Sequence, residues 1–213
     1  MPEAETLLSL SDELGQRCWA LMNLAGRYAY AGREWVARKV VQLLGGVEVE
    51  LVHNHHNFAW REIHGGEELV VVRKGATPAF PGQKGFVGGS MGDDAVILQG
   101  CTDPGARPLQ EAALFSTVHG AGRVMSRREA LGKRHRKTGA LLEPGKVSVE
   151  EMDAWLRAKG VIRRGGDVDE SPQVYRRLTE VLAAQGPTIQ VLHTLRPLVV
   201  VMAGAGVEDP YKD

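Results

Sequence analysis

Apolar residues near the start of the chain recur at the spacing of an α-helix. The repeating positions lie three and four residues apart: Leu14, Cys18, Leu21, Met22 and Ala25. Residues at this spacing share one helix face, and the same rhythm continues over 35–44, so the pattern predicts helix across 11–44. Gly45 and Gly46 follow directly, and glycine commonly ends a helix.

Three later segments have the pattern of β-strands. Residues 47–53 (VEVELVH) alternate, and residues 69–73 (LVVVR) are rich in branched side chains. Residues 95–100 (AVILQG) form a continuous apolar run, which predicts a strand buried on both faces. Twelve glycines lie between Gly65 and Gly122, so we expect tight loops between the strands of this region.

Helix returns in the last third of the chain. Ser148 and Glu151 form a capping box, which predicts a helix to about Ala158. Ser171 and Pro172 supply a cap and a first-turn proline for a helix reaching about residue 184. Residues 188–204 (TIQVLHTLRPLVVVMAG) predict two short strands on either side of 196–197. We therefore expect one α+β domain over 1–213, with a glycine-rich mixed sheet flanked by helices.

Composition excludes several classes of protein. Of the 213 residues, 43% are apolar and 24% are charged, which argues against disordered and fibrous chains. The 26 basic and 26 acidic residues cancel, so attraction to nucleic acid by bulk charge is not expected. No apolar run reaches the ~20 residues that span a bilayer. The acidic N-terminus does not resemble a signal peptide, and the two cysteines lack CxxC partners. We expect a cytoplasmic protein with free thiols and no membrane partner.

A histidine cluster closes the first expected strand. His53, His55 and His56 lie within four residues, and strand alternation would point the first two to one face and His56 to the other. Neutral imidazole is a common metal ligand, so the cluster could bind a metal or a phosphate. A polar strand end whose imidazoles bond to backbone is an equally good interpretation.

Two further segments could contact phosphate. Arg73 and Lys74 end a strand before Gly75, although a charged turn is the commoner use of such a pair. Residues 85–92 contain four glycines whose N–H groups could converge on an anion, with Ser90 adding a hydroxyl. This loop has neither a Walker A nor a GxGxxG pattern, so ordinary turns would also explain it.

His119 lies directly before Gly120-Ala121-Gly122. An expected helix follows, its start would favour a phosphate, and Arg123 or Arg127 could clamp it. An accessible imidazole there would suit a nucleophile that attacks phosphorus, whereas a core histidine beside a turn is the alternative. Residues 123–137 hold seven basic residues and one acidic residue, enough to hold an RNA or DNA backbone or to form a solvated face.

These pieces, in this order, resemble the RtcB family of RNA-splicing ligases. The matching stretches are HHNFAWREIH (55–64), RKGATPAFPGQKG (73–85), GGSMG (88–92), HGAGRVMSRREA (119–130) and DESPQVYR (169–176). The resemblance covers nearly the whole chain, but only the C-terminal half to two-thirds of a family member. It implies a fold like the C-terminal part of the RtcB fold.

The resemblance also implies a reaction and its residues. The family joins an RNA 3′-phosphate or 2′,3′-cyclic phosphate to a 5′-hydroxyl, using GTP and Mn²⁺ and a guanylyl-histidine intermediate. By motif position, His119 would be the catalytic nucleophile and His56 the metal ligand. The two histidines would share the nucleotide site with Asn57, Gly88, Gly89, Ser90, Met91, Gly120, Ala121 and Gly122.

Several family features are missing, and they keep a second function open. The Asp-x-x-Cys and Asn-His-Phe-x-Glu motifs are absent, Gly88 stands where the family has proline, Ala95 replaces a serine, and Met202-Ala203 replaces the C-terminal Lys-Gly. One hypothesis is an RNA ligase that needs a separate N-terminal RtcB-like chain or a homo-oligomer. The other is a non-catalytic, nucleotide-binding or scaffolding relative. A metal-dependent phosphoesterase ranks third.

Overall fold

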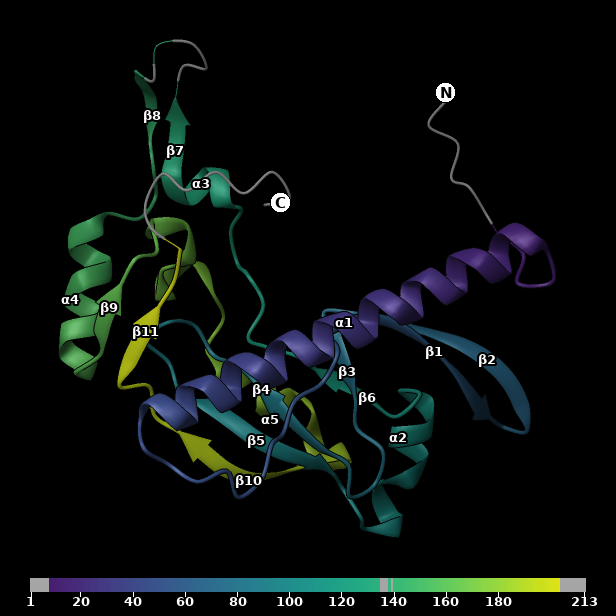
Figure 1. Cartoon of the computed structure of the whole chain (residues 1–213). Helices are drawn as coiled ribbons and strands as arrows, with labels where there is room; N and C mark the ends of the chain where they lie inside the picture. Colours follow the sequence, from purple (N-terminus) through teal and green to yellow (C-terminus); the bar gives the residue numbers. More distant parts are fainter. Residues whose placement is uncertain (1–7, 135–137, 139, 204–213) are drawn as a thin grey trace.

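The protein combines one long helix with several small sheets (Figure 1). The computed structural model describes residues 8–134, 138 and 140–203. Within these residues the strands form one three-stranded and four two-stranded sheets. The expected α+β class is confirmed, but the prediction of a single glycine-rich sheet is wrong. Glycines with positive φ, such as Gly75 (φ +74°) between β2 and β3, turn the chain before a longer strand can form.

Helix α1 (Glu13–Leu43) confirms the helix expected over 11–44. It ends before Gly45, whose φ of +67° favours glycine. The helix packs on β1 at Gly26, where an added Cβ would lie 2.5 Å from the Phe58 ring. Only glycine therefore permits this close approach. None of the described helices combines the length and apolar character required to cross a bilayer.

Strands β1 (Asn57–His64) and β2 (Glu67–Lys74) form an antiparallel hairpin, which confirms the strand expected at 69–73. Its turn is Gly65-Gly66, both with positive φ. The prediction of a strand at 47–53 is wrong, because these residues form no strand. Val47 and Val49 are 86% and 95% exposed, and side chains rather than a neighbouring strand hold this segment. Glu50 pairs with Lys84 at 2.7 Å, for example.

Strand β5 (Ala95–Gly100) is the centre of the sheet β10-β5-β4, where β10 is Ile189–Leu195 and β4 is Lys84–Val87. The strand was predicted correctly, but its burial on both faces was not. Val96 and Leu98 are buried, whereas the alternate positions are partly exposed. The reason is the antiparallel sheet, which packs one face against Leu178 at the start of α5 (Leu178–Ala184).

A second core lies around α4 (Val149–Lys159), which the Ser148–Glu151 capping box starts as predicted. It is built from Met91, Ala130, Val147, Met152, Leu156, Val161, Val168 and Val174. Beside it lie α3 (Arg127–Leu131), β7 (Gly132–Arg134) with β8 (Leu141–Pro144), and the parallel pair β9 (Ile162–Arg164) and β11 (Val199–Val201). Strands β10 and β11 confirm the two strands expected around 196–197.

The helix expected from residue 172 to 184 begins later than its sequence signals indicate. The 3₁₀ turns η2 (Val168–Glu170) and η3 (Pro172–Val174) come first, then extended chain, and then α5. Tyr175 pairs with Arg123, and the Arg176 N–H donates to the Gly122 carbonyl at 2.9 Å. These long-range bonds hold the backbone extended and override the local cap.

A buried arginine joins β2 to β6 (Ser116–Val118). Arg73 is 2% exposed and donates to both Glu62 oxygens at 2.6 and 2.9 Å. It also donates to Ser116 Oγ and to the Leu114 carbonyl, each at 2.8 Å. Burial tends to raise the pKa of Glu62, but hydrogen bonds from Arg73 and His64 outweigh it and lower that pKa. The prediction that Arg73 contacts phosphate is therefore wrong, because its guanidinium is buried and bonded to Glu62.

Replacing Arg73 should lower the free energy of unfolding far more than replacing its exposed neighbour. Arg73→Ala leaves the Glu62 carboxylate without its main partner, a loss that costs about 3–5 kcal/mol in buried pairs. Lys74→Ala should change the value by less than about 0.5 kcal/mol. Urea denaturation of both variants measures the difference, and equal effects would contradict the role given to Arg73.

Candidate functional site

Two histidines distant in sequence lie ring to ring. His56 precedes β1 and His119 follows β6, and their ring centroids are 4.9 Å apart with 15° between the planes. The Gly75 N–H donates to the His56 carbonyl at 2.9 Å. The next residue, Ala76 in β3 (Ala76–Pro78), pairs with Val118, directly before His119. The backbone bond from Gly75 to His56 and the strand pairing of the next residue, Ala76, with Val118 therefore place the two imidazoles together.

Gly75 shapes the chain at this point. Its φ of +74° lies in the region that favours glycine. An added Cβ would lie 3.7 Å from His119 Cδ2 and 3.8 Å from Nε2, an ordinary contact distance. The requirement for glycine thus comes from the backbone turn that brings β3 alongside β6, not from lack of space.

A cavity of about 400 Å³ opens beside His119. Its walls are Gly88, Gly89, His119, Gly120, Ala121, Gly122, Arg123 and Tyr175. Two backbone segments meet here: the Gly88 N–H donates to the His119 carbonyl at 3.4 Å, and the Ala121 N–H donates to the Gly88 carbonyl at 3.2 Å. A cavity of this size with backbone walls fits a nucleotide.

The structure brings some of the predicted site residues to this cavity and leaves others away from it. Ser90 donates to Asp93 at 2.9 Å, and Met91 packs in the core around α4. Asn57 is the first residue of β1 and pairs with Lys74. The nucleotide contacts of these three residues stay predictions. His56 is not among the residues that line the cavity, but it stacks on His119, which is.

Tyr175 lines the cavity but was not among the predicted site residues, and Arg123, expected only as a possible phosphate clamp, lines it too. Arg123 donates to the Tyr175 hydroxyl at 3.0 Å and to the Asp169 carbonyl at 2.7 Å. Tyr175 donates to Glu170, and burial together with this bond raises the pKa of Tyr175 to about 12. The DESPQVYR stretch was the signal that could have identified Tyr175.

The phosphate clamp expected from Arg123 or Arg127 stays a prediction, because both arginines bond to protein groups in this structure. Arg123 is committed to the groups named above, and Arg127 pairs with Asp169 at 2.9 Å and with Glu170. The helix expected after His119 is present as α3, which begins at Arg127 and is capped by Ser126 and Glu129. In the basic segment, residues 135–137 lie outside the described part of the chain.

The histidine cluster divides as strand alternation suggested, although the segment is not a strand. His53 and His55 both contact the Tyr30 ring on α1, with centroids 4.3 and 4.1 Å away, whereas His56 faces His119. Among the described residues, no three His, Cys, Asp or Glu side chains gather closely enough to hold a metal ion. A complete manganese site therefore does not fit these residues, whereas a nucleotide fits the cavity.

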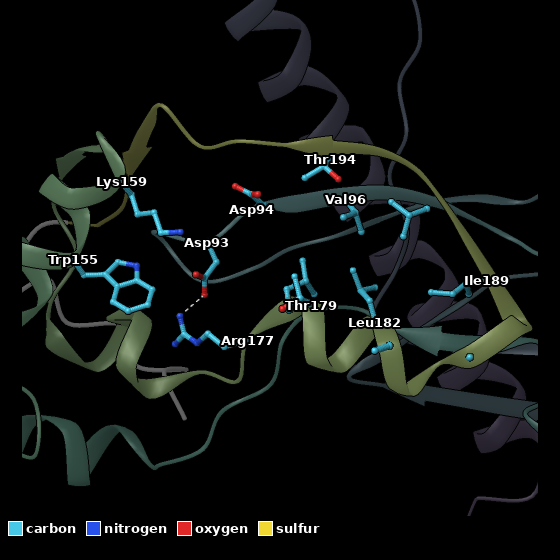
Figure 2. Close-up of a pocket in the computed structure, with 14 residues that line it drawn as sticks. Asp93, Asp94, Val96, Trp155, Lys159, Arg177, Thr179, Leu182, Ile189 and Thr194 are labelled. Carbon is cyan, nitrogen blue, oxygen red and sulfur yellow. Dashed lines mark hydrogen bonds and ion pairs between the residues drawn. The ribbon is translucent and has the colours of Figure 1, made fainter.

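A second cavity, of about 610 Å³, is lined by residues that include Asp93, Trp155 and Arg177 (Figure 2). Asp93, which accepts from Ser90, pairs with Arg177 at 2.8 Å, and the Arg177 guanidinium lies 4.8 Å from the centre of the Trp155 ring. Through Asp93, these contacts fix Ser90 of the glycine-rich segment 85–92. Among the described residues, no histidine or cysteine lines this cavity, so the candidate site for phosphoryl chemistry is the one at His119.

The environment of His119 keeps its imidazole neutral. Burial, followed by repulsion from His56, lowers the pKa of His119 below its ordinary value of 6.5. A neutral ring retains the nitrogen lone pair that a nucleophile needs. Protonation is therefore disfavoured down to a lower pH than for a free histidine.

Removing His56 should raise the pKa of His119 toward 6.5, because one cause of its lowering disappears. A pH titration of the histidine ring signals by NMR measures this in the wild type and in His56→Ala. Asn57→Ala, which leaves both rings in place, is the control and should not move the midpoint. An unchanged His119 midpoint in His56→Ala would contradict the coupling of the two rings.

Comparison with known proteins places the chain in a family. The sequence pattern of the family described as "tRNA-splicing ligase RtcB" matches residues 4–203. The RNA-splicing ligase RtcB of Escherichia coli K12 is 35% identical over 169 residues, covering 78% of this chain and 36% of the relative. The RNA-splicing ligase RtcB of Mycobacterium tuberculosis is 32% identical, covering 80% and 40%. The tRNA-splicing ligase RtcB of Nanoarchaeum equitans is 30% identical, covering 84% and 38%.

The chain thus spans well under half the length of these relatives. The match nevertheless extends over almost all of its own sequence and includes both histidines of the stacked pair. The chain belongs to the RtcB family of tRNA-splicing ligases.

Proposed function

We propose that this chain carries the guanylyl-transfer site of an RNA ligase that joins a 3′-phosphate or 2′,3′-cyclic phosphate end to a 5′-hydroxyl end. One observation carries the proposal. His119, with a lowered pKa, lies against His56 at the edge of a glycine-lined cavity of about 400 Å³. The names of its relatives support RNA as the substrate.

The chemistry follows from the neutral imidazole. A ring nitrogen of His119 attacks the α-phosphorus of GTP, an N–P bond forms, and the bond to the leaving pyrophosphate breaks. A 2′,3′-cyclic end is first opened by water, which breaks the P–O2′ bond and leaves a 3′-phosphate and a 2′-hydroxyl. The RNA 3′-phosphate then takes the GMP from His119, and the 5′-hydroxyl displaces GMP to form the new phosphodiester bond. The backbone N–H groups of Gly89, Gly120 and Gly122 would face the phosphates and stabilise developing negative charge, because those of Gly88 and Ala121 already bond within the protein.

Manganese needs more ligands than the described residues bring together. His56 would supply one imidazole, whereas stable sites use three or four protein ligands. No group of three ligating side chains exists among the described residues. We propose that a separate N-terminal RtcB-like chain supplies the remaining ligands. Mn²⁺ binding by this chain alone should be weak.

The second candidate function is a nucleotide-binding or scaffolding relative without ligase activity. The same lack of a three-ligand group favours it. So do Ala95 and Met202-Ala203, which replace the serine and the Lys-Gly that the family resemblance implies. This candidate keeps the cavity at His119 for binding but gives the imidazole no covalent role.

A ligation assay separates the two candidates. RNA with 3′-phosphate and 5′-hydroxyl ends is incubated with GTP, Mn²⁺, this chain and a polypeptide carrying the two missing motifs. We expect joined RNA in the complete mixture, and a loss of at least about 10³-fold with His119→Ala, because nothing replaces the nucleophile.

The matched control is His193→Ala, which removes an exposed imidazole on β10 and should leave ligation unchanged. Joining that survives His119→Ala would assign the nucleophile elsewhere. GTP binding in calorimetry without ligation in any mixture would favour the second candidate.

A further inference from the structure

The long helix α1 has two apolar faces, and the protein covers only one. The inner face lies against the hairpin and the histidine segment through residues such as Trp19, Gly26 and Tyr30. The other face, which we name the outer seam, consists of Leu14, Cys18, Leu21, Ala25, Tyr28, Gly32 and Trp35. All seven residues are exposed.

The outer seam has the spacing of a helix–helix contact. Its members are separated alternately by four and three residues, the heptad pattern of packed helices. Leu21, Tyr28 and Trp35 are 65%, 82% and 66% exposed. Large apolar side chains in a continuous exposed row mark an interaction surface, because folded proteins seldom leave such rows in water.

Side-chain size alternates strictly along the seam. The large residues recur every seven positions, and so do the small ones between them: Cys18, Ala25 and Gly32. A Cβ added to Gly32 would meet nothing within 4 Å, so no described part of this chain accounts for the absence of a side chain there. The small residues instead leave recesses in the exposed surface.

The alternation fits an antiparallel second copy of the helix. In a parallel pair, equivalent residues face each other, so large would meet large and small would meet small. In an antiparallel pair, large residues can enter the recesses. In one register, each small residue faces a large residue of the second copy: Gly32 lies opposite Leu21, Ala25 opposite Tyr28, and Cys18 opposite Trp35. Because the pairing is reciprocal, it forms a closed two-fold interface.

The charges beside the seam do not oppose this pairing. Arg17 pairs with Glu13 at 4.0 Å, and Arg38 pairs with Glu34 and Glu48, each at 3.1 Å. The flanks between these arginines carry Met22, Leu24, Ala29 and Ala31. Two copies can therefore approach without burying an unpaired charge among these residues.

The surface available is sufficient for a specific dimer. The two tyrosines and two tryptophans of such a pair would remove roughly 450–750 Å² of surface, given that each ring buries about 150–250 Å² and that Tyr28 and Trp35 are 82% and 66% exposed. The leucines and flanking residues add to this. The total would approach the ~1,000 Å² that distinguishes specific interfaces from chance contacts.

We infer that this chain forms a homodimer in which the outer seams of two α1 helices pack antiparallel. The seam lies on the side of α1 away from Tyr30 and the histidine segment. Both nucleotide cavities would therefore stay accessible, and the dimer does not depend on the proposed ligase activity.

Sedimentation equilibrium at tens of micromolar tests the dimer. The wild type should sediment as a dimer, and Tyr28→Arg should be a monomer, because the new charge would enter the recess at Ala25 of the second copy. The matched control is Ile63→Arg, which alters a 66% exposed apolar residue on β1 and should remain a dimer. Circular dichroism checks that both variants fold. A monomeric wild type, or a dimer that survives Tyr28→Arg, would overturn the inference.

Cross-linking tests the direction, with Cys101→Ser as the background. In the antiparallel register, the two Cys18 residues lie about 26 Å apart, at 1.5 Å rise per residue, which is too far for a disulfide. Trp35→Cys places a thiol opposite Cys18 of the second copy and should give a covalent dimer on oxidation, whereas Trp35→Ser should not. A covalent dimer through Cys18 alone would indicate a parallel pair and overturn the inference.

Discussion

The buried ion pair between Arg73 and Glu62 is the constraint on which the candidate site depends. Arg73 lies two residues before Gly75 and bonds to groups just before and within β6, so it fixes β2 against β6. His56 is tied to Gly75, and His119 follows β6 directly. The stacking of the two imidazoles is therefore set by a charge pair well inside the protein. A buried pair of this kind specifies one arrangement, whatever its net contribution to stability.

Charge pairs also shape the cavity at His119. Asp169 and Glu170 engage Arg123, Arg127 and Tyr175, so the basic groups nearest the histidine serve as framework. The cavity is then walled mainly by backbone, with an imidazole whose pKa is lowered. That combination suits the handling of phosphate groups by dipoles and a neutral nucleophile, without a cluster of free cations.

Local signals predicted the local structure well. The heptad-like spacing of α1, the Ser148–Glu151 box and the apolar run of β5 depend on neighbours in sequence. Residues 47–53 alternated like a strand but had no partner, and Tyr175 was held extended by Arg123 against its local cap. Motif resemblance identified His56 and His119 separately. Their contact depends on pairing between β3 and β6, forty residues apart, which no local pattern encodes. Arg73 was misread because a charged strand end looks the same in sequence whether it is buried or solvated.

The measurement that tests the central claim most directly is the position of a covalent guanylyl group. The chain is incubated with GTP and Mn²⁺ in a mixture that joins RNA, then digested and mapped by mass spectrometry under conditions that preserve N–P bonds. The structure predicts GMP on His119, the histidine at the cavity, and on none of the other six histidines of the chain. GMP on a different residue, or a chain that stays unmodified while RNA is joined, would contradict the account.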